Sequence, residues 1–408
     1  MCWAATLVLL APTSGNSGVE TCGCAVEQPA DGSYCECAPT GPCVEPNILN
    51  VVEFLPAIEC ERPPPRQWGD GWAMPPFPPS SCEATLVESL TERHRDPGCE
   101  ETVAAGFMNY GLGSTFHYLI MQMQRAARDR KPIAFSGEWV YGGCPARDFT
   151  CAFDPVSHCN RSGAALTYPR MVAEPLPWVM EEGYAACAQG RINALFHFIS
   201  TLAGFLFRPN ADMRRAAQEA GVRMGLPERY LGVHVRNGDF CHAHTVTVDP
   251  KECHPATAFA DALLKASQAT GVTDVYIATD NADTIPVMQG LCPELSFFFN
   301  TEVRRDWLRV SDQDLESGEI FLEQRLFKAD LAKRQNHLQE IMVDIMLLAR
   351  SEAMVGQFTS NISRLVVALG TFLRAGSLLP FVSLDHPWCW NGFRPTDFGA
   401  KFGRDFWC

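Results

Sequence analysis

A short apolar run between Tyr230 and Val235 ends in polar groups and a glycine, in the order Tyr-Leu-Gly-Val-His-Val-Arg-Asn-Gly-Asp. Side chains alternate along a strand, so His234 and Arg236 are predicted to share one face of it. Ligands of open α/β sheets bind at the carboxyl ends of strands, and the planar fork of an arginine suits phosphate. The pattern favours a nucleotide-phosphate site. The competing interpretation is a strand end with a surface salt bridge.

Further polar groups occupy comparable positions later in the chain. They are Asp280 and Asn281 after a predicted strand, Asp344 within a long predicted helix, and Thr359, Ser360 and Asn361 where another helix begins. Unpaired amides at a helix N-terminus attract anions. Taken singly, Ser360 is also a plausible helix cap, and Asp344 a surface acid or the partner of a buried arginine. The combination favours an anion-binding site.

The elements that carry these groups alternate between strand and helix. Strands are predicted at 231–236, 273–279, 295–299 and 352–357, and helices at 256–268, 322–350 and from 361 to about 369. This order is typical of a parallel sheet covered by helices. We therefore assign residues 216–375 to a Rossmann-like C-terminal unit.

A glycine-rich turn opens an earlier α/β unit, which we place at 83–215. Gly111 and Gly113 lie in this turn, before a helix predicted at 115–128. The unit also has a predicted strand at 132–135, a turn at 139–143 that contains Tyr141, and an apolar helix at 191–207. Residues 19–82 are rich in Cys and Pro and are predicted to form a stem, while residues 376–408 are expected to be a loop-like tail.

Composition restricts the class of partner and compartment. The chain of 408 residues has a formal net charge of -14, which argues against nucleic acid as the main partner but does not exclude a nucleotide in a local basic pocket. Its 18 cysteines favour several disulfides and an oxidising compartment. Cys-x-Cys spacings such as Cys22 to Cys24 are too tight for the usual zinc ribbon.

The first residues suggest a targeting segment. Residues 1–18 are predicted to be a signal peptide or a truncated signal anchor that once held the protein at a membrane. Asn160 begins a glycosylation sequon, which fits the secretory route. A second sequon begins at Asn361, inside the predicted anion site.

Five short motifs, in this order, resemble those of the α1,6-fucosyltransferase family, which includes the vertebrate N-glycan core enzyme and the bacterial nodulation fucosyltransferase. They are the turn at Gly111–His117, Trp139-Val140-Tyr141, His234–Asp239, Ala278–Asn281 and Phe358–Arg364. Asp344 also stands at the family's distance before Ser360. The resemblance covers about residues 105–370.

The resemblance implies a GT-B-like fold, in which two Rossmann-like units face each other across a cleft behind the Cys/Pro-rich extension. It implies GDP-fucose as donor, no metal cofactor, and inverting transfer of fucose to a glycan or glycoprotein hydroxyl in the Golgi lumen. The expected linkage is α1,6 to a GlcNAc of an N-glycan or chito-oligosaccharide.

The resemblance also implies roles for individual residues. Arg236 would hold the β-phosphate, and His234 and Asp344 would contact the guanosine. Phosphate would also be bound at Thr359, Ser360 and Asn361, Asp280 would line the donor site, and Tyr141, Gly111 and Gly113 would close over the nucleotide.

Two departures from the family pattern leave alternatives open. Asn237 replaces the second arginine of the family pair, and the loop after Asp239 differs, so we choose Glu252 or Asp249 as the catalytic base. A protein O-fucosyltransferase acting on a disulfide-rich domain, or a non-catalytic binding homologue, are the competing hypotheses. Asp312 and Asp314 are interpreted as a solvated loop rather than a metal site.

Overall fold

A computed structural model describes residues 75–95, 99–107, 111–159, 180–189, 193–237, 254–301, 322–385 and 388, and the backbone of short strands at 6–7, 22–27, 36–39 and 52–54. Its centre is a six-stranded sheet in the order β4-β11-β10-β7-β8-β9. These strands are β4 (Val52–Phe54), β11 (Phe381–Ser383), β10 (Met354–Gly356), β7 (Leu231–Val235), β8 (Asp274–Thr279) and β9 (Ser296–Phe298). All neighbours are parallel except β4, which pairs antiparallel with β11 at one edge.

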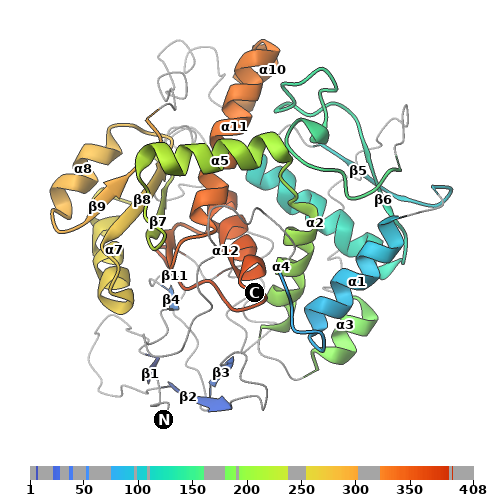
Figure 1. Cartoon of the computed structure of the whole chain (residues 1–408), viewed down its shortest axis with the longest axis horizontal. Helices are drawn as coiled ribbons and strands as arrows, with labels where there is room; N and C mark the ends of the chain where they lie inside the picture. The colour runs from blue at the N-terminus through green and yellow to red at the C-terminus, as the bar shows by residue number, and fades with distance from the viewer. Residues whose placement is uncertain are drawn as a thin grey trace, which may run out of the picture.

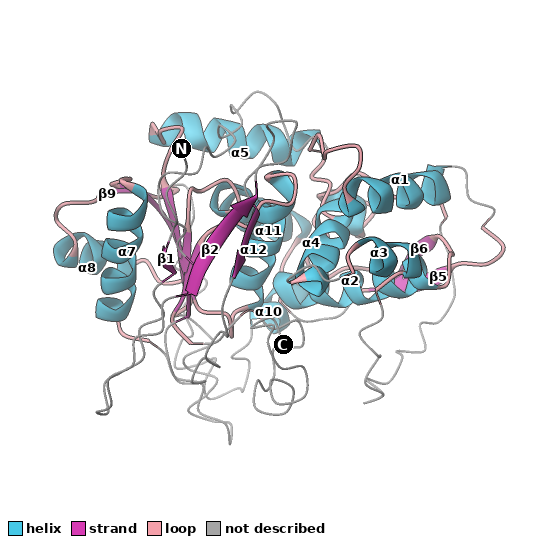
Figure 2. Cartoon of the chain, turned by 90° about the horizontal axis from the view of Figure 1, so that it is seen from below, coloured by secondary structure: helices cyan, strands magenta, loops and turns pink. Residues whose placement is uncertain are grey.

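Different helices cover the two faces of this sheet (Figures 1 and 2). On one face, α7 (Ala256–Thr270) and α8 (Thr284–Leu291) pack with Val233, Val235 and Ile277. On the other, α11 (Leu331–Leu348) and α12 (Asn361–Leu373) pack with Tyr276, and α5 (Ala211–Met224) lies against α11. The inner strands β7, β8, β10 and β11 are buried, which is why they consist mainly of apolar residues.

The N-terminal side has its own small parallel sheet. Strands β5 (Val103–Gly106) and β6 (Ile133–Ser136) pair in parallel and are joined by α2 (Leu112–Arg128). Around them lie α1 (Cys82–Arg95), the 3₁₀ turn η2 (Phe149–Cys151), α3 (Glu182–Cys187) and α4 (Ala194–Leu206). A separate antiparallel sheet consists of β1 (Thr6–Leu7), β2 (Cys22–Glu27) and β3 (Glu36–Pro39). The predicted α/β class with parallel strands is thus confirmed.

Helices α4 and α12 join the two sides into one core. The Ser200 hydroxyl donates to the Ala368 carbonyl at 2.6 Å, and a Cβ on Gly204 would lie 2.0 Å from the Phe372 ring. No residue larger than glycine fits at position 204 without a shift of that ring.

Two predictions about the elements are wrong. The single helix expected at 322–350 is two helices, α10 (Leu322–Lys328) and α11, because the Asp330 carboxylate accepts from the Lys333 amide at 2.7 Å and caps a new helix. The tail expected to be loop-like contains β11, which occupies a buried place beside β10. Helices α1 and α5 were not anticipated.

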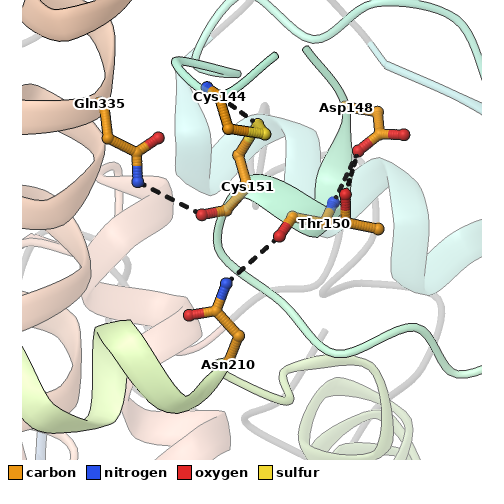
Figure 3. Close-up of a disulfide and its surroundings, with 6 residues drawn as sticks. All are labelled: Cys144, Asp148, Thr150, Cys151, Asn210 and Gln335. Carbon is orange, nitrogen blue, oxygen red and sulfur yellow. Dashed lines mark hydrogen bonds between the residues drawn. A yellow bond between two sulfur atoms is a disulfide. The ribbon is translucent and has the colours of Figure 1, made fainter. Parts of the chain in front are cut away.

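The expectation of disulfides is confirmed for six cysteines. The bonds are Cys82–Cys187, Cys99–Cys159 and Cys144–Cys151. Figure 3 shows the last of these beside α11, where Gln335 donates to the Cys151 carbonyl at 3.3 Å. No helix in the described ranges is long and apolar enough to cross a membrane.

Removing the bonds should destabilise the protein according to loop length. Chain entropy predicts a loss of about 4 to 5 kcal/mol for Cys82→Ala/Cys187→Ala, which opens a separation of 105 residues, and about 2 to 3 kcal/mol for Cys144→Ala/Cys151→Ala, which opens one of 7. Urea unfolding of both double variants tests this order. The reverse order would contradict the entropic account.

Candidate functional site

Arg236 lies at the carboxyl edge of the central sheet, directly after β7. Its Nη1 contacts Asp280 Oδ2 at 2.5 Å, and Asp280 Oδ1 accepts from the Asn237 amide at 2.8 Å. Asp280 directly follows β8, so the ends of two neighbouring strands are linked by one carboxylate. The Arg236 side chain stays 30% exposed while that of Asp280 is 13% exposed. The more buried Asp280 carboxylate therefore orients the Arg236 guanidinium, which remains accessible to a ligand.

His234 is buried below Arg236 and connects β7 to α12. Its Nδ1 lies 2.8 Å from the Ser363 hydroxyl oxygen. Burial, and then the nearby Arg236 charge, lower the pKa of His234 to about 3. The imidazole is consequently neutral at physiological pH and does not act as a cation toward a phosphate.

The buried histidine makes stability depend on pH. Its pKa is about 3 when folded against about 6.5 when unfolded, so the unfolded chain binds more protons below pH 6.5 and stability falls as the pH falls. Between pH 7 and 5 this one group should cost about 2 kcal/mol. Urea unfolding at both pH values measures this effect. The free energy of unfolding of His234→Asn should fall between pH 7 and 5 by about 2 kcal/mol less than that of the wild type. An unchanged loss would refute the assignment.

The N-terminus of α12 is not capped by a side chain. Ser360 is the N-cap residue, but its hydroxyl makes no capping hydrogen bond. The helix begins at Asn361, and the first amides of any helix lack carbonyl partners within it. The cap interpretation of Ser360 therefore does not account for its side chain.

The N-terminus of α2 meets that of α12. Gly111 is the N-cap residue of α2 and also provides no side-chain cap. Asn361 Nδ2 donates to the Ser114 hydroxyl at 2.6 Å, and the Asn361 carbonyl lies 3.1 Å from His117 Nε2. A Cβ on Gly113 would lie 2.8 Å from the backbone of Asn361. Two positive helix ends are thereby brought together.

Tyr141 connects this junction to α10. Its hydroxyl accepts from the Leu112 amide at 3.2 Å and donates to Glu323 Oε1 at 2.8 Å. The side chain is only 1% exposed, and burial, followed by the Glu323 charge, raises the pKa of Tyr141 well above its usual value. The phenol stays protonated and acts as a bridge between elements. Glu323 was not predicted, because one carboxylate in a helical stretch carries no distinguishing pattern.

The amide and the hydroxyl of Thr359 are both used in hydrogen bonds to Asp385. Both donate to Asp385 Oδ2, at 3.0 and 2.5 Å, and the Phe358 amide donates to Asp385 Oδ1 at 2.6 Å. Asp385 was also missed, although it follows a buried strand as Asp280 does. The signal was obscured because that strand is only three residues long.

Asp344 lies on the same face of the sheet as His234, closer to the amino ends of the strands. Tyr276 donates to Asp344 Oδ1 at 2.5 Å, and Tyr276 pairs in register with Gly232, two residues before His234. The Asp344 contact is therefore displaced from His234 by roughly 7 Å along the strand. The structure groups Arg236, Asp280, Ser360 and Asn361 at the edge and places Asp344 below them.

Several predicted residues lie outside the described ranges. These are both candidate bases, Asp249 and Glu252, the sequon at Asn160, and the pair Asp312 and Asp314. Within the part of the chain that the structure describes, no three His, Cys, Asp or Glu side chains gather as metal ligands would. The choice between the two bases stays a prediction.

Comparison with known proteins gives structural matches only. No family model and no curated protein matches the chain. NodZ alpha-1,6-fucosyltransferase soaked with GDP-fucose matches with 16% identity and a TM-score of 0.42, covering 66% of this chain and 92% of that one. NodZ from Bradyrhizobium matches with 15% identity and a TM-score of 0.40, over 65% and 92%. A mutant of Arabidopsis thaliana FUT1 in complex with GDP matches with 11% identity and a TM-score of 0.38, over 71% and 73%. These proteins are fucosyltransferases, the class that the sequence motifs resemble.

Proposed function

We propose that this protein is a glycosyltransferase that takes fucose from GDP-fucose. One observation carries the proposal: Arg236, held by Asp280, stands at the carboxyl edge of the sheet, and the N-termini of α2 and α12, which receive no cap from the side chains of their own N-cap residues, meet there. The Arg236 guanidinium and the N-terminus of α12 make a site for an anion in an otherwise acidic protein. A nucleoside diphosphate is such an anion.

The same groups would assist the chemical step. As the bond between fucose and GDP breaks, negative charge builds on the β-phosphate, and donors already aimed at it stabilise the transition state. Arg236 and the first-turn amides of α12 would supply these donors. Attack by an acceptor hydroxyl from the opposite side would invert the anomeric carbon, with Glu252 or Asp249 as the base that removes its proton.

The motif resemblance is our basis for directing the nucleoside end toward His234 and Asp344. There, His234 is neutral, and the Asp344 carboxylate is oriented by Tyr276. A carboxylate accepts hydrogen bonds only, so Asp344 suits the N–H groups along one edge of guanine. This acceptor character of Asp344, together with the motif resemblance, is our basis for preferring GDP over other diphosphates.

For the acceptor we propose a GlcNAc of an N-glycan or chito-oligosaccharide, joined through an α1,6 linkage, in the lumen of the secretory pathway, with the Golgi as the expected compartment. The motif order supports the acceptor class, and three disulfides support the compartment. The structure gives no observation that favours the protein O-fucosyltransferase or the non-catalytic homologue over this proposal. At Asn237 the contact that reaches Asp280 comes from the backbone amide, which an arginine would also provide.

The proposal is tested first by GDP binding and then by consumption of GDP-fucose with an acceptor. GDP should raise the melting temperature more than UDP or GMP does, and EDTA should not remove the effect. GDP-fucose should then be consumed with a chito-oligosaccharide or an N-glycan, but not with a folded disulfide-rich domain. Absence of GDP stabilisation would refute the donor assignment. Transfer to the folded domain would favour the protein O-fucosyltransferase, and binding without turnover would favour the non-catalytic homologue.

A further inference from the structure

The Asp385 carboxylate accepts three hydrogen bonds from the turn that precedes α12. Beyond its bonds to the Phe358 amide and to the amide and hydroxyl of Thr359, Oδ1 also accepts from the Ser383 hydroxyl at 3.1 Å. Asp385 therefore fastens two consecutive amides of the turn to the end of β11. Fixed amides on one side of a turn define where the following helix points.

This arrangement decides which amides a ligand can reach. The Ser360 amide donates to the Gln357 carbonyl at 3.1 Å within the turn, and the amides of Phe358 and Thr359 are taken by Asp385. An anion at this edge is left with the first turn of α12, which starts at Asn361. Asp385 thus directs the anion toward the helix end that meets α2.

A buried cation lies behind the same turn. Arg364 is 2% exposed, donates through Nη2 to Asn361 Oδ1, and has its backbone carbonyl bonded by Trp388 Nε1 at 3.1 Å. Burial lowers the pKa of Arg364 to about 10, opposed by the nearby Asp385 charge, so the group stays charged at pH 7. A cation in the first turn of a helix opposes the usual preference for acids there, and it increases the positive potential.

We propose that Asp385 is a positioning residue for the donor diphosphate: it holds the turn at 358–360 so that the N-terminus of α12, with Arg364 behind it, faces the β-phosphate. This inference rests on the proposed donor site. It predicts an effect that depends on the phosphate, because Asp385 is bonded to the turn and not to the nucleoside end.

The test compares GDP with GMP, which lacks the β-phosphate, by isothermal titration. Asp385→Asn replaces one acceptor oxygen by an NH₂ group that opposes a backbone N–H, and should weaken GDP binding about 10-fold or more while changing GMP binding less than about 3-fold. Thr359→Val, which loses only the hydroxyl, should weaken GDP binding by about 2- to 10-fold, and Thr359→Ser should restore it. Asp274→Asn is the control, because Asp274 lies at the amino end of β8, and it should leave both affinities unchanged.

The outcomes separate the inference from the function on which it rests. A wild-type protein that does not bind GDP would overturn the donor site and the inference together. Wild-type binding with equal GDP affinity in Asp385→Asn would overturn the inference alone. Equal weakening of GDP and GMP would show that Asp385 has only a structural role. If Asp385→Asn does not fold, the GDP and GMP affinities of Thr359→Val test the inference in the same way. Thr359→Ser keeps the hydroxyl and should then bind GDP as tightly as the wild type does.

Discussion

Arg236→Ala is expected to weaken GDP binding by about 10- to 100-fold, the usual value for losing hydrogen bonds to a charged group. If fucosyl transfer is measured, kcat should fall by about 10²- to 10³-fold, since the lost donor acts where charge develops. The reason is geometric. A guanidinium has five N–H donors in a plane, and Asp280 holds this one through Nη1 at the strand edge. Titration calorimetry and initial rates would measure both effects.

Two companion variants make the result specific. Arg236→Lys keeps the charge but not the planar fork, so it should recover binding only in part. Arg223→Ala removes an arginine on α5 whose side chain is 45% exposed, and should leave GDP binding and turnover unchanged. GDP affinity equal to wild type in Arg236→Ala would remove the basis for the donor site.

Gly113→Ala is expected to separate the two helix N-termini. The new Cβ would lie 2.8 Å from the Asn361 carbonyl carbon and from the Ile362 nitrogen, closer than real side chains approach backbone. Overpacking of this kind costs about 1 to 3 kcal/mol, while the better helix propensity of alanine returns up to about 1 kcal/mol. We expect a modest net loss of stability together with at least about 10-fold weaker GDP binding, because the first turn of α12 must move.

Gly290→Ala is the matched control, because Gly290 lies in α8 and an added Cβ meets no atom within 4 Å. It should raise stability slightly and leave GDP affinity unchanged. Unfolding in urea and GDP titration on both variants measure the contrast. Tight GDP binding by Gly113→Ala would show that the junction of α2 and α12 is not part of the donor site.

The positions of Arg236 and Asp280 at strand ends followed from a general rule about parallel strands, whereas the ion pair between them came from the structure. Each residue directly follows an apolar strand, and neighbouring parallel strands present their carboxyl ends at one edge. The same rule applies to Asp385 after β11, but a three-residue strand in an aromatic segment is too short to show a period. Asp385 was therefore missed because its strand is short, not because the chemistry at the end of the strand is different.

The break between α10 and α11 shows a different limit. Periodicity runs through 322–350, and only the cap formed by Asp330 separates the helices. An aspartate within a helical stretch is common, so its role depends on whether the backbone bends there. That bend brings Glu323 to Tyr141, which is 182 residues away in the chain.

The sequence by itself determined the chemistry at the sheet edge: a cation and carboxylates at strand ends, glycines at a turn, and a Thr-Ser-Asn run where a helix begins, all written in local patterns of a few residues. The tertiary structure alone decided how these meet. Asn361 reaches Ser114 across 247 residues because α2 packs against the start of α12, with Gly113 directly against the Asn361 backbone. The charge state of His234 was likewise decided by the fold, because desolvation depends on what surrounds a side chain and not on its neighbours in sequence.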